Sequence, residues 1–114
     1  MATPSAAPPE ILDALYQVIE ARRDERPEGS YVVSLLDGGP QAMAAKVLEE
    51  AEEVCVAARE ESDDALAREV ADLVFHVFVV LASRGVAPAN VYRELAGRFG
   101  IGGLEEKAAR ASKS

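Results

Sequence analysis

The apolar residues of the chain recur at helical spacing in four separate stretches. The first stretch predicts a helix over residues 9–25, with apolar side chains three or four positions apart: Ile11, Leu12, Leu15, Val18 and Ile19. Two longer helices are predicted over residues 41–60 and 64–84, and a fourth begins at Pro88. The inner side of this fourth helix is expected to carry Val91, Leu95 and Phe99. The pattern therefore predicts an all-α fold, a bundle of four to five helices.

The segments outside these helices divide the chain into one domain with two short ends. Residues 1–8 are small and proline-rich, so we expect a disordered lead. The apolar run within residues 30–40 is closed by two glycines and a proline and has no partner strand, which favours an ordered loop over a strand. One helical domain is then expected over residues 9–103, followed by a tail over residues 104–114 that forms a turn or two of helix and frays.

The helix predicted over residues 41–60 has one apolar sector with acidic residues at its edge. The residues expected to face the core are Met43, Val47, Leu48, Ala51, Val54, Cys55 and Ala58. Glu50 and Glu53 line one edge of that sector together with Lys46, whereas Glu49 and Glu52 point further toward water. Cys55 is therefore expected to be a small core residue, and a single cysteine excludes a disulfide within the chain.

The helix predicted over residues 64–84 is apolar all round in its second half. From Leu73 to Ala82, nine of ten residues are apolar and the exception is His76. The helix is too short to cross a bilayer, so we expect it to be buried, with a partner subunit covering the face that one small domain leaves open. Glu69 and Asp72 form a polar stripe with His76, and Glu69 falls in the core-facing sector. A lone histidine on an apolar face is most often a hydrogen-bonded core residue.

Two pairs of carboxylates carry the chemical signal of the chain. Glu50 and Glu53 are three residues apart, as are Glu69 and Asp72, which places the members of each pair side by side on a helix. Like charges at this spacing repel and are costly to desolvate, so a cation is the favoured partner. Ligation by oxygen alone favours a hard ion, Mg²⁺ or in its place Mn²⁺. For the first pair, a solvated acidic face and an ordinary helix ion pair with Lys46 remain alternatives.

Composition narrows the classes of function. The net charge is −8 and lysines and arginines are not clustered, so the sequence has no electrostatic footprint for nucleic acid. Aromatic residues are 5% of the chain and tryptophan is absent, so the core should consist of Ala, Val, Leu and Ile. No apolar run has the length of a signal peptide or a membrane span. We therefore expect a cytoplasmic protein with no membrane partner.

The acidic segments resemble a known family. The string KVLEEAEEV from Lys46 to Val54 and the string EVADLVFH from Glu69 to His76 are similar to phosphoribosyl-ATP pyrophosphatases of histidine biosynthesis. This family belongs to the all-α, MazG-like nucleoside triphosphate pyrophosphatase superfamily, whose signature is E-x-x-E followed by E-x-x-D. Further similarity lies in residues 15–19, 27–31, 81–86, 91–95 and 103–110. Family members often carry Thr, Lys and Gly where this chain has Val32, Ser34 and Leu48.

The resemblance implies a Mg²⁺-dependent homodimer that hydrolyses phosphoribosyl-ATP to phosphoribosyl-AMP and pyrophosphate. The metal ligands it implies are Glu50, Glu53, Glu69 and Asp72. On this interpretation Lys46 neutralises charge on the substrate phosphates, and Glu49 is the base that orients the attacking water. Two alternatives remain open: a MazG-like pyrophosphatase acting on free nucleoside triphosphates, and a non-catalytic helical dimerisation module.

Overall fold

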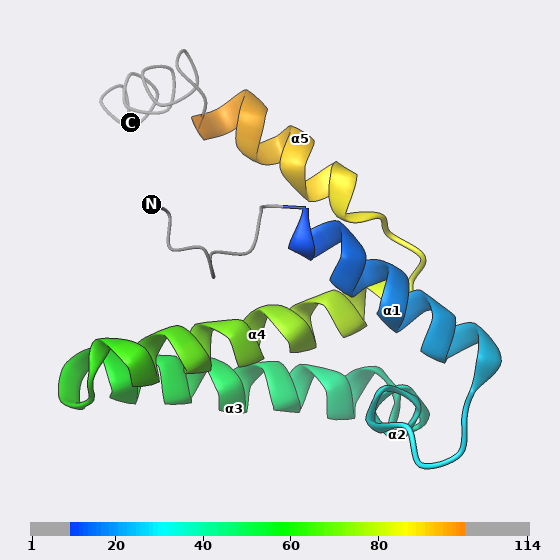
Figure 1. Ribbon diagram of the computed structural model, residues 1–114, viewed down its shortest axis with the longest axis horizontal. Helices are drawn as coiled ribbons and strands as arrows, with labels where there is room; N and C mark the ends of the chain where they lie inside the picture. Colours follow the sequence, from blue (N-terminus) through cyan, green and yellow to red (C-terminus); the bar gives the residue numbers. More distant parts are fainter. Residues whose placement is uncertain (1–9, 100–114) are drawn as a thin grey trace.

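The computed structural model describes residues 10–99, and within that range the chain forms five α-helices and no strand (Figure 1). In chain order the helices are α1 (Ile11–Glu25), α2 (Tyr31–Asp37), α3 (Gly39–Glu60), α4 (Asp63–Ser83) and α5 (Pro88–Phe99). The predicted all-α fold is confirmed. The predicted lead over residues 1–8 and the predicted tail over residues 104–114 lie outside the described residues.

Helices α3 and α4 form a long antiparallel hairpin, which is the most extensive helix–helix contact of the described chain (Figure 1). The Ser62 hydroxyl caps α4 by accepting a hydrogen bond from the backbone N–H of Ala65, at 3.2 Å. At the other end of α4, Gly85 has a φ of +68°, the left-handed conformation that commonly follows a helix. The hairpin sets the middle of α3 opposite the first half of α4, and these are the segments that carry the two carboxylate pairs.

The core lies where α1, α2 and α3 meet the second half of α4 (Figure 1). Its buried residues are Tyr16, Ile19, Val32, Met43, Phe78, Val79 and Ala82. The Tyr16 and Phe78 rings meet edge to face, with centroids 6.2 Å apart. Helix α5 packs mainly against α1, and the Tyr92 hydroxyl donates a hydrogen bond to the Asp13 carboxylate at 3.0 Å. No single described helix is long and apolar enough to cross a membrane; α4 and α5 meet that test only as a pair, bent by 114° at the break between them.

The segment predicted as an ordered loop over residues 30–40 is instead helical, because Tyr31–Asp37 forms α2 and α3 begins at Gly39. The Ser30 hydroxyl accepts a hydrogen bond from the backbone N–H of Val33 at 3.2 Å and so caps α2. Seven residues are too few to make a helix stable by itself in water. Helix α2 forms because Val32 is buried in the core, a tertiary contact that the run of apolar residues did not indicate.

The buried face of α3 is rotated from the predicted one. Met43, Glu50 and Ala57 are buried, at seven-residue spacing, whereas Leu48 is 71% exposed and Cys55 and Ala58 are exposed as well. The prediction that these last three face the core is wrong for this chain. A wide apolar sector does not indicate which of its sides meets the neighbouring helix, and α4 contacts the side that carries Glu50.

Helix α4 leaves Val70 and Val77 exposed, so within the single chain one of its faces is open, as the sequence predicted. A predicted burial fails on the last helix. On α5, Val91 is half-buried but Leu95 is exposed, because only one side of α5 contacts α1. The Phe99 side chain lies outside what the structure describes.

Candidate metal centre between α3 and α4

The carboxylates of α3 and α4 converge where the two helices face each other. Glu50, Glu69 and Asp72 each offer one oxygen, and these three oxygens lie within 4.8 Å of one another. Glu49, Glu50 and Glu53 form a second group with the same property, so Glu50 belongs to both. The structure therefore brings the four predicted metal ligands together with Glu49. We call these five residues the acid cluster.

Glu69 is a half-buried carboxylate among other carboxylates. Its Oε1 is fully covered by protein and has no hydrogen-bond partner among the described residues. Burial raises the pKa of the Glu69 carboxyl, and the neighbouring carboxyls of Glu53 and Asp72 raise it further. A covered carboxylate oxygen with no donor is expected where a cation completes the site. The residues present therefore fit a hard divalent cation.

Lys46 lies at the rim of the acid cluster. Its Nζ is 2.8 Å from Glu49 Oε1 and 3.5 Å from Glu50 Oε2. The hydrogen bond between the two side chains raises the pKa of Lys46 and lowers the pKa of Glu49. No described lysine or arginine forms an ion pair with Glu53, Glu69 or Asp72. The ordinary helix ion pair considered above therefore exists, but Lys46 offsets negative charge only at Glu49 and Glu50.

His76 is buried behind the acid cluster and has a partner at each ring nitrogen. Its Nδ1 is 2.7 Å from the backbone oxygen of Asp72, and its Nε2 is 2.8 Å from the Tyr31 hydroxyl. The prediction of a hydrogen-bonded core histidine is confirmed. Tyr31 is the residue near the site that sequence reasoning missed, since its partner lies 45 positions away and its segment was expected to be a loop. The only local signal was Ser30, a good helix cap directly before an apolar run.

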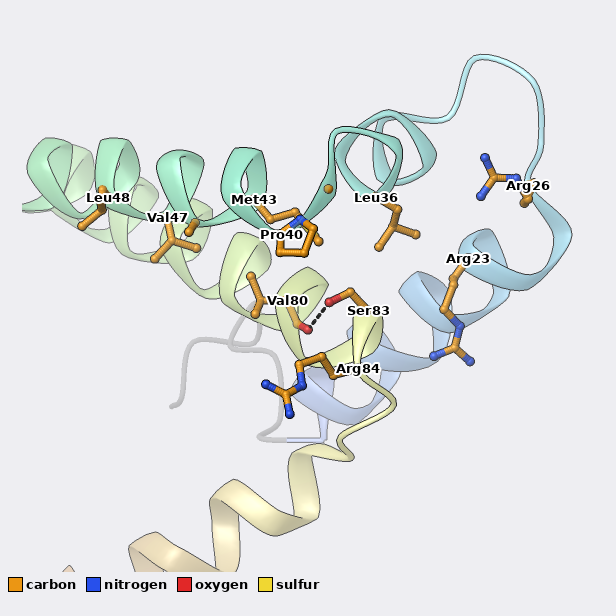
Figure 2. Close-up of a pocket in the computed structure, with 12 residues that line it drawn as sticks. Arg23, Arg26, Leu36, Pro40, Met43, Val47, Leu48, Val80, Ser83 and Arg84 are labelled. Carbon is orange, nitrogen blue, oxygen red and sulfur yellow. Dashed lines mark hydrogen bonds between the residues drawn. The ribbon is translucent and has the colours of Figure 1, made fainter.

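A separate groove of about 840 Å³ lies between α1, α3 and α4 (Figure 2). Figure 2 shows Pro40, Val47 and Leu48 along α3 and Val80 on α4 facing this groove, with Arg84 beside the end of α4. Arg23 and Arg26 line it from the α1 side. None of the acid-cluster residues lines the groove, because it lies on the Leu48 side of α3 rather than on the Glu50 side.

Comparison with known proteins decides the family. The family described as Phosphoribosyl-ATP pyrophosphohydrolase matches residues 12–99, a range that contains the whole acid cluster. The chain belongs to the phosphoribosyl-ATP pyrophosphohydrolase family. The predictions of this family and of an enzyme of the hydrolase class are therefore confirmed.

Two named relatives are similar to this chain over nearly their whole length, and a third is a longer protein. The Phosphoribosyl-ATP pyrophosphatase of Chromobacterium violaceum is 45% identical over 102 residues, which cover 90% of this chain and 94% of that protein. The one of Trichlorobacter lovleyi is 47% identical over 100 residues, covering 88% and 93% respectively. The Histidine biosynthesis bifunctional protein HisIE of Helicobacter hepaticus is 45% identical over 100 residues, but this chain covers only 43% of its length.

Proposed function

We propose that this family member hydrolyses phosphoribosyl-ATP to phosphoribosyl-AMP and pyrophosphate in histidine biosynthesis, as a Mg²⁺-dependent homodimer in the cytoplasm. The observation that carries the chemistry is the convergence of carboxylates from α3 and α4 around a Glu69 oxygen that has no donor. The substrate is supported by the family match and by the names of the relatives.

The proposed metal ligands are Glu50, Glu53, Glu69 and Asp72. A divalent cation held there would supply positive charge to the phosphate oxygens and would lower the pKa of the attacking water. The contribution of the protein is to hold the carboxylates close together before substrate arrives, through the packing of α3 on α4. A chain with a net charge of −8 would otherwise repel a polyphosphate, which is a further argument for a cation between the two.

Lys46 and Glu49 are placed to act on the substrate side of the acid cluster. The Lys46 ammonium is held by two carboxylates, and we expect substrate phosphates to draw it away from Glu49. The hydrogen bond from Lys46 lowers the pKa of Glu49, so its carboxylate is a weaker base while that bond lasts. Once phosphate draws the ammonium away, Glu49 can orient the attacking water and accept its proton. In the proposed reaction that water attacks the α-phosphorus, the bond to the bridging oxygen breaks, and pyrophosphate leaves.

Substitution of two proposed ligands tests the metal site. Glu53→Gln and Asp72→Asn should each lower the rate of pyrophosphate release by about 100-fold or more, since charge stabilisation by a metal is worth several kcal/mol. Glu52→Gln is the matched control, because Glu52 is an exposed acid of the same helix outside the acid cluster. Folded variants that keep full activity at low Mg²⁺ would overturn the assignment.

A panel of substrates separates phosphoribosyl-ATP from free nucleoside triphosphates, which a MazG-like enzyme would hydrolyse with the same acids. Val32 differs from the Thr common in the family, but it is buried in the core and so cannot contact substrate. Ser34 is exposed, and its hydroxyl donates a hydrogen bond to the backbone oxygen of Tyr31. We expect pyrophosphate release to be fastest with phosphoribosyl-ATP; equal or faster release from dNTPs would favour the MazG-like alternative.

The dimer is proposed from an apolar face that the single chain leaves open. On α4, Val70 and Val77 are exposed and continue at seven-residue spacing to Arg84 at the groove. On α3, Leu48 and Cys55 have the same spacing and are also exposed. We define these five residues as the groove face. A second copy of the chain would cover it, because apolar side chains exposed along two packed helices are typical of subunit contacts.

A further inference from the structure

Tyr31 and His76 join α2 to the turn of α4 that carries Asp72. The Tyr31 ring stacks on Phe75 with an interplanar angle of 13° and a centroid distance of 6.0 Å. His76 stands edge to face against both rings, at 5.8 Å from Tyr31 and 5.1 Å from Phe75. The imidazole is 7% exposed, so its orientation is fixed by packing as well as by its two hydrogen bonds.

The chemistry of the partners fixes the direction of the two hydrogen bonds in the neutral histidine. A backbone carbonyl only accepts, so His76 Nδ1 must carry the proton that is donated to the Asp72 oxygen. His76 Nε2 then has a lone pair and accepts a hydrogen bond from the Tyr31 hydroxyl. The result is a chain of donation from Tyr31 through His76 to the main chain of Asp72, whose carboxylate is part of the acid cluster.

Tyr31 is half exposed and also lines a second pocket of about 510 Å³, formed by the turn and helix between Arg26 and Asp37. It is thus the residue that connects this pocket to the Asp72 turn.

We propose that Tyr31 and His76 are positioning residues, which hold the Asp72 turn of α4 in the geometry that the acid cluster needs to bind its cation. This inference rests on the proposed function, because it presumes that the acid cluster binds a divalent cation. Neither side chain belongs to the acid cluster. They act through the main chain at Asp72, in the way that outer hydrogen bonds orient metal ligands.

The test measures cation binding by the full chain, without an affinity tag that contains histidine and without substrate. Mn²⁺ is titrated calorimetrically into the wild type, Tyr31→Phe, His76→Gln and the double variant. Tyr31→Phe keeps the ring that stacks on Phe75 and removes only the hydroxyl, so the fold should be retained. Tyr92→Phe is the matched control: it removes another hydroxyl that donates a hydrogen bond, at the α1/α5 contact.

We expect Tyr31→Phe to raise the Mn²⁺ dissociation constant about fivefold, the effect of losing one hydrogen bond that orients a ligand. His76→Gln should raise it about tenfold, the double variant no further than His76→Gln alone, and Tyr92→Phe not at all. Wild-type affinity in Tyr31→Phe, or additive losses in the double variant, would refute the positioning role and leave the metal site standing. A wild type that does not bind Mn²⁺ would instead refute the metal site of the proposed function, and this inference with it.

Magnetic resonance gives a readout that a merely structural role would not move. His76 is the only histidine of the chain, so its ring nitrogens can be assigned without ambiguity. Their signals should report a proton on Nδ1 and shift on addition of Mg²⁺. In Tyr31→Phe the Nε2 signal should change and the Mg²⁺ response should become weaker. A proton on Nε2, or an unchanged Mg²⁺ response in Tyr31→Phe, contradicts the proposal.

Discussion

Glu69 shows how one side chain can oppose folding and serve binding. Its covered oxygen lacks a donor, and its neighbours Glu53 and Asp72 carry the same charge. Both features disfavour the ionised form in the folded protein and are relieved by a cation. Glu69 should therefore destabilise the protein in the absence of metal and contribute to metal binding at the same time, a conflict that is common at functional sites.

Replacing the charge of Glu69 by an amide of the same shape separates these two effects. In EDTA, Glu69→Gln should melt at a higher temperature than the wild type, because one repelling charge is gone. With millimolar Mg²⁺, the wild type should gain stability and Glu69→Gln should gain little. Thermal melting with and without Mg²⁺ measures both, and Glu52→Gln should behave as the wild type does. An unaltered Mg²⁺ response in Glu69→Gln would exclude Glu69 as a ligand.

The raised pKa of Glu69 also predicts how the stability of the metal-free protein depends on pH. In the unfolded chain the carboxyl titrates near 4.5, and in the folded protein its pKa is higher. The protonated form is thus favoured by folding: this stabilisation is complete below pH 4.5 and is lost as the pH rises through the folded pKa. The melting temperature of the wild type relative to Glu69→Gln, measured in EDTA, should therefore fall as the pH rises over that interval. A difference that does not vary with pH would contradict the raised pKa.

At the residue scale, local spacing predicted which acids are paired but not what surrounds them. Residues three apart on a helix are neighbours whatever the rest of the fold does, so the pairs Glu50/Glu53 and Glu69/Asp72 could be read from the sequence. The burial of Glu50 and the contact of Tyr31 with His76 depend on how separate helices dock. The periodicity of any single helix carries no information about such contacts.

At the scale of elements, α2 is the part of the fold that depends most on its surroundings. It has seven residues, a serine cap and one buried side chain, Val32. It also presents Tyr31 to α4. Long helices such as α3 and α4 were predictable because fifteen or more residues repeat one pattern. A helix of one or two turns has too few repeats of the apolar pattern to be predicted from it. Its capping residue is then the most informative feature of its sequence.

The cap of α2 can be tested by one substitution. Ser30→Ala removes the acceptor for the Val33 N–H and should lower the free energy of unfolding by about 1 kcal/mol. Ser34→Ala is the control in the same helix, since its hydroxyl bonds only to the preceding turn and alanine is the better helix former. Denaturant unfolding of both variants gives the comparison. Equal losses, or no loss in Ser30→Ala, would show that the cap does not stabilise α2.

At the scale of the whole molecule, the main feature is a chain that leaves apolar surface open on two long helices. Two residues of the groove face, Leu48 and Arg84, line the groove of about 840 Å³ between α1, α3 and α4 (Figure 2). The sequence predicted an excess of apolar surface on α4 and a second subunit to cover it. It did not predict that Leu48 and Cys55 of α3 would be exposed too, since they were assigned to the core.

A charge placed on the groove face tests the proposed dimer. Leu48→Lys should raise the dissociation constant of the dimer about tenfold or more, because the ammonium would be buried without a partner. Val18→Lys is the control: Val18 is an exposed apolar residue of α1 that does not line the groove. Sedimentation velocity over a range of concentrations distinguishes monomer from dimer. A wild type that sediments as a monomer, or a Leu48→Lys variant that stays dimeric, would rule out this face as the contact.

The position of Glu50 has a consequence for stoichiometry. Its carboxylate is shared between the two oxygen groups of the acid cluster, one within α3 and one spanning α3 and α4. Two ions bound to these groups would be bridged by a single side chain, and each would alter the affinity for the other. The dissociation constants of the first and second ions would then differ, because the first bound ion changes the charge that the second ion meets at Glu50.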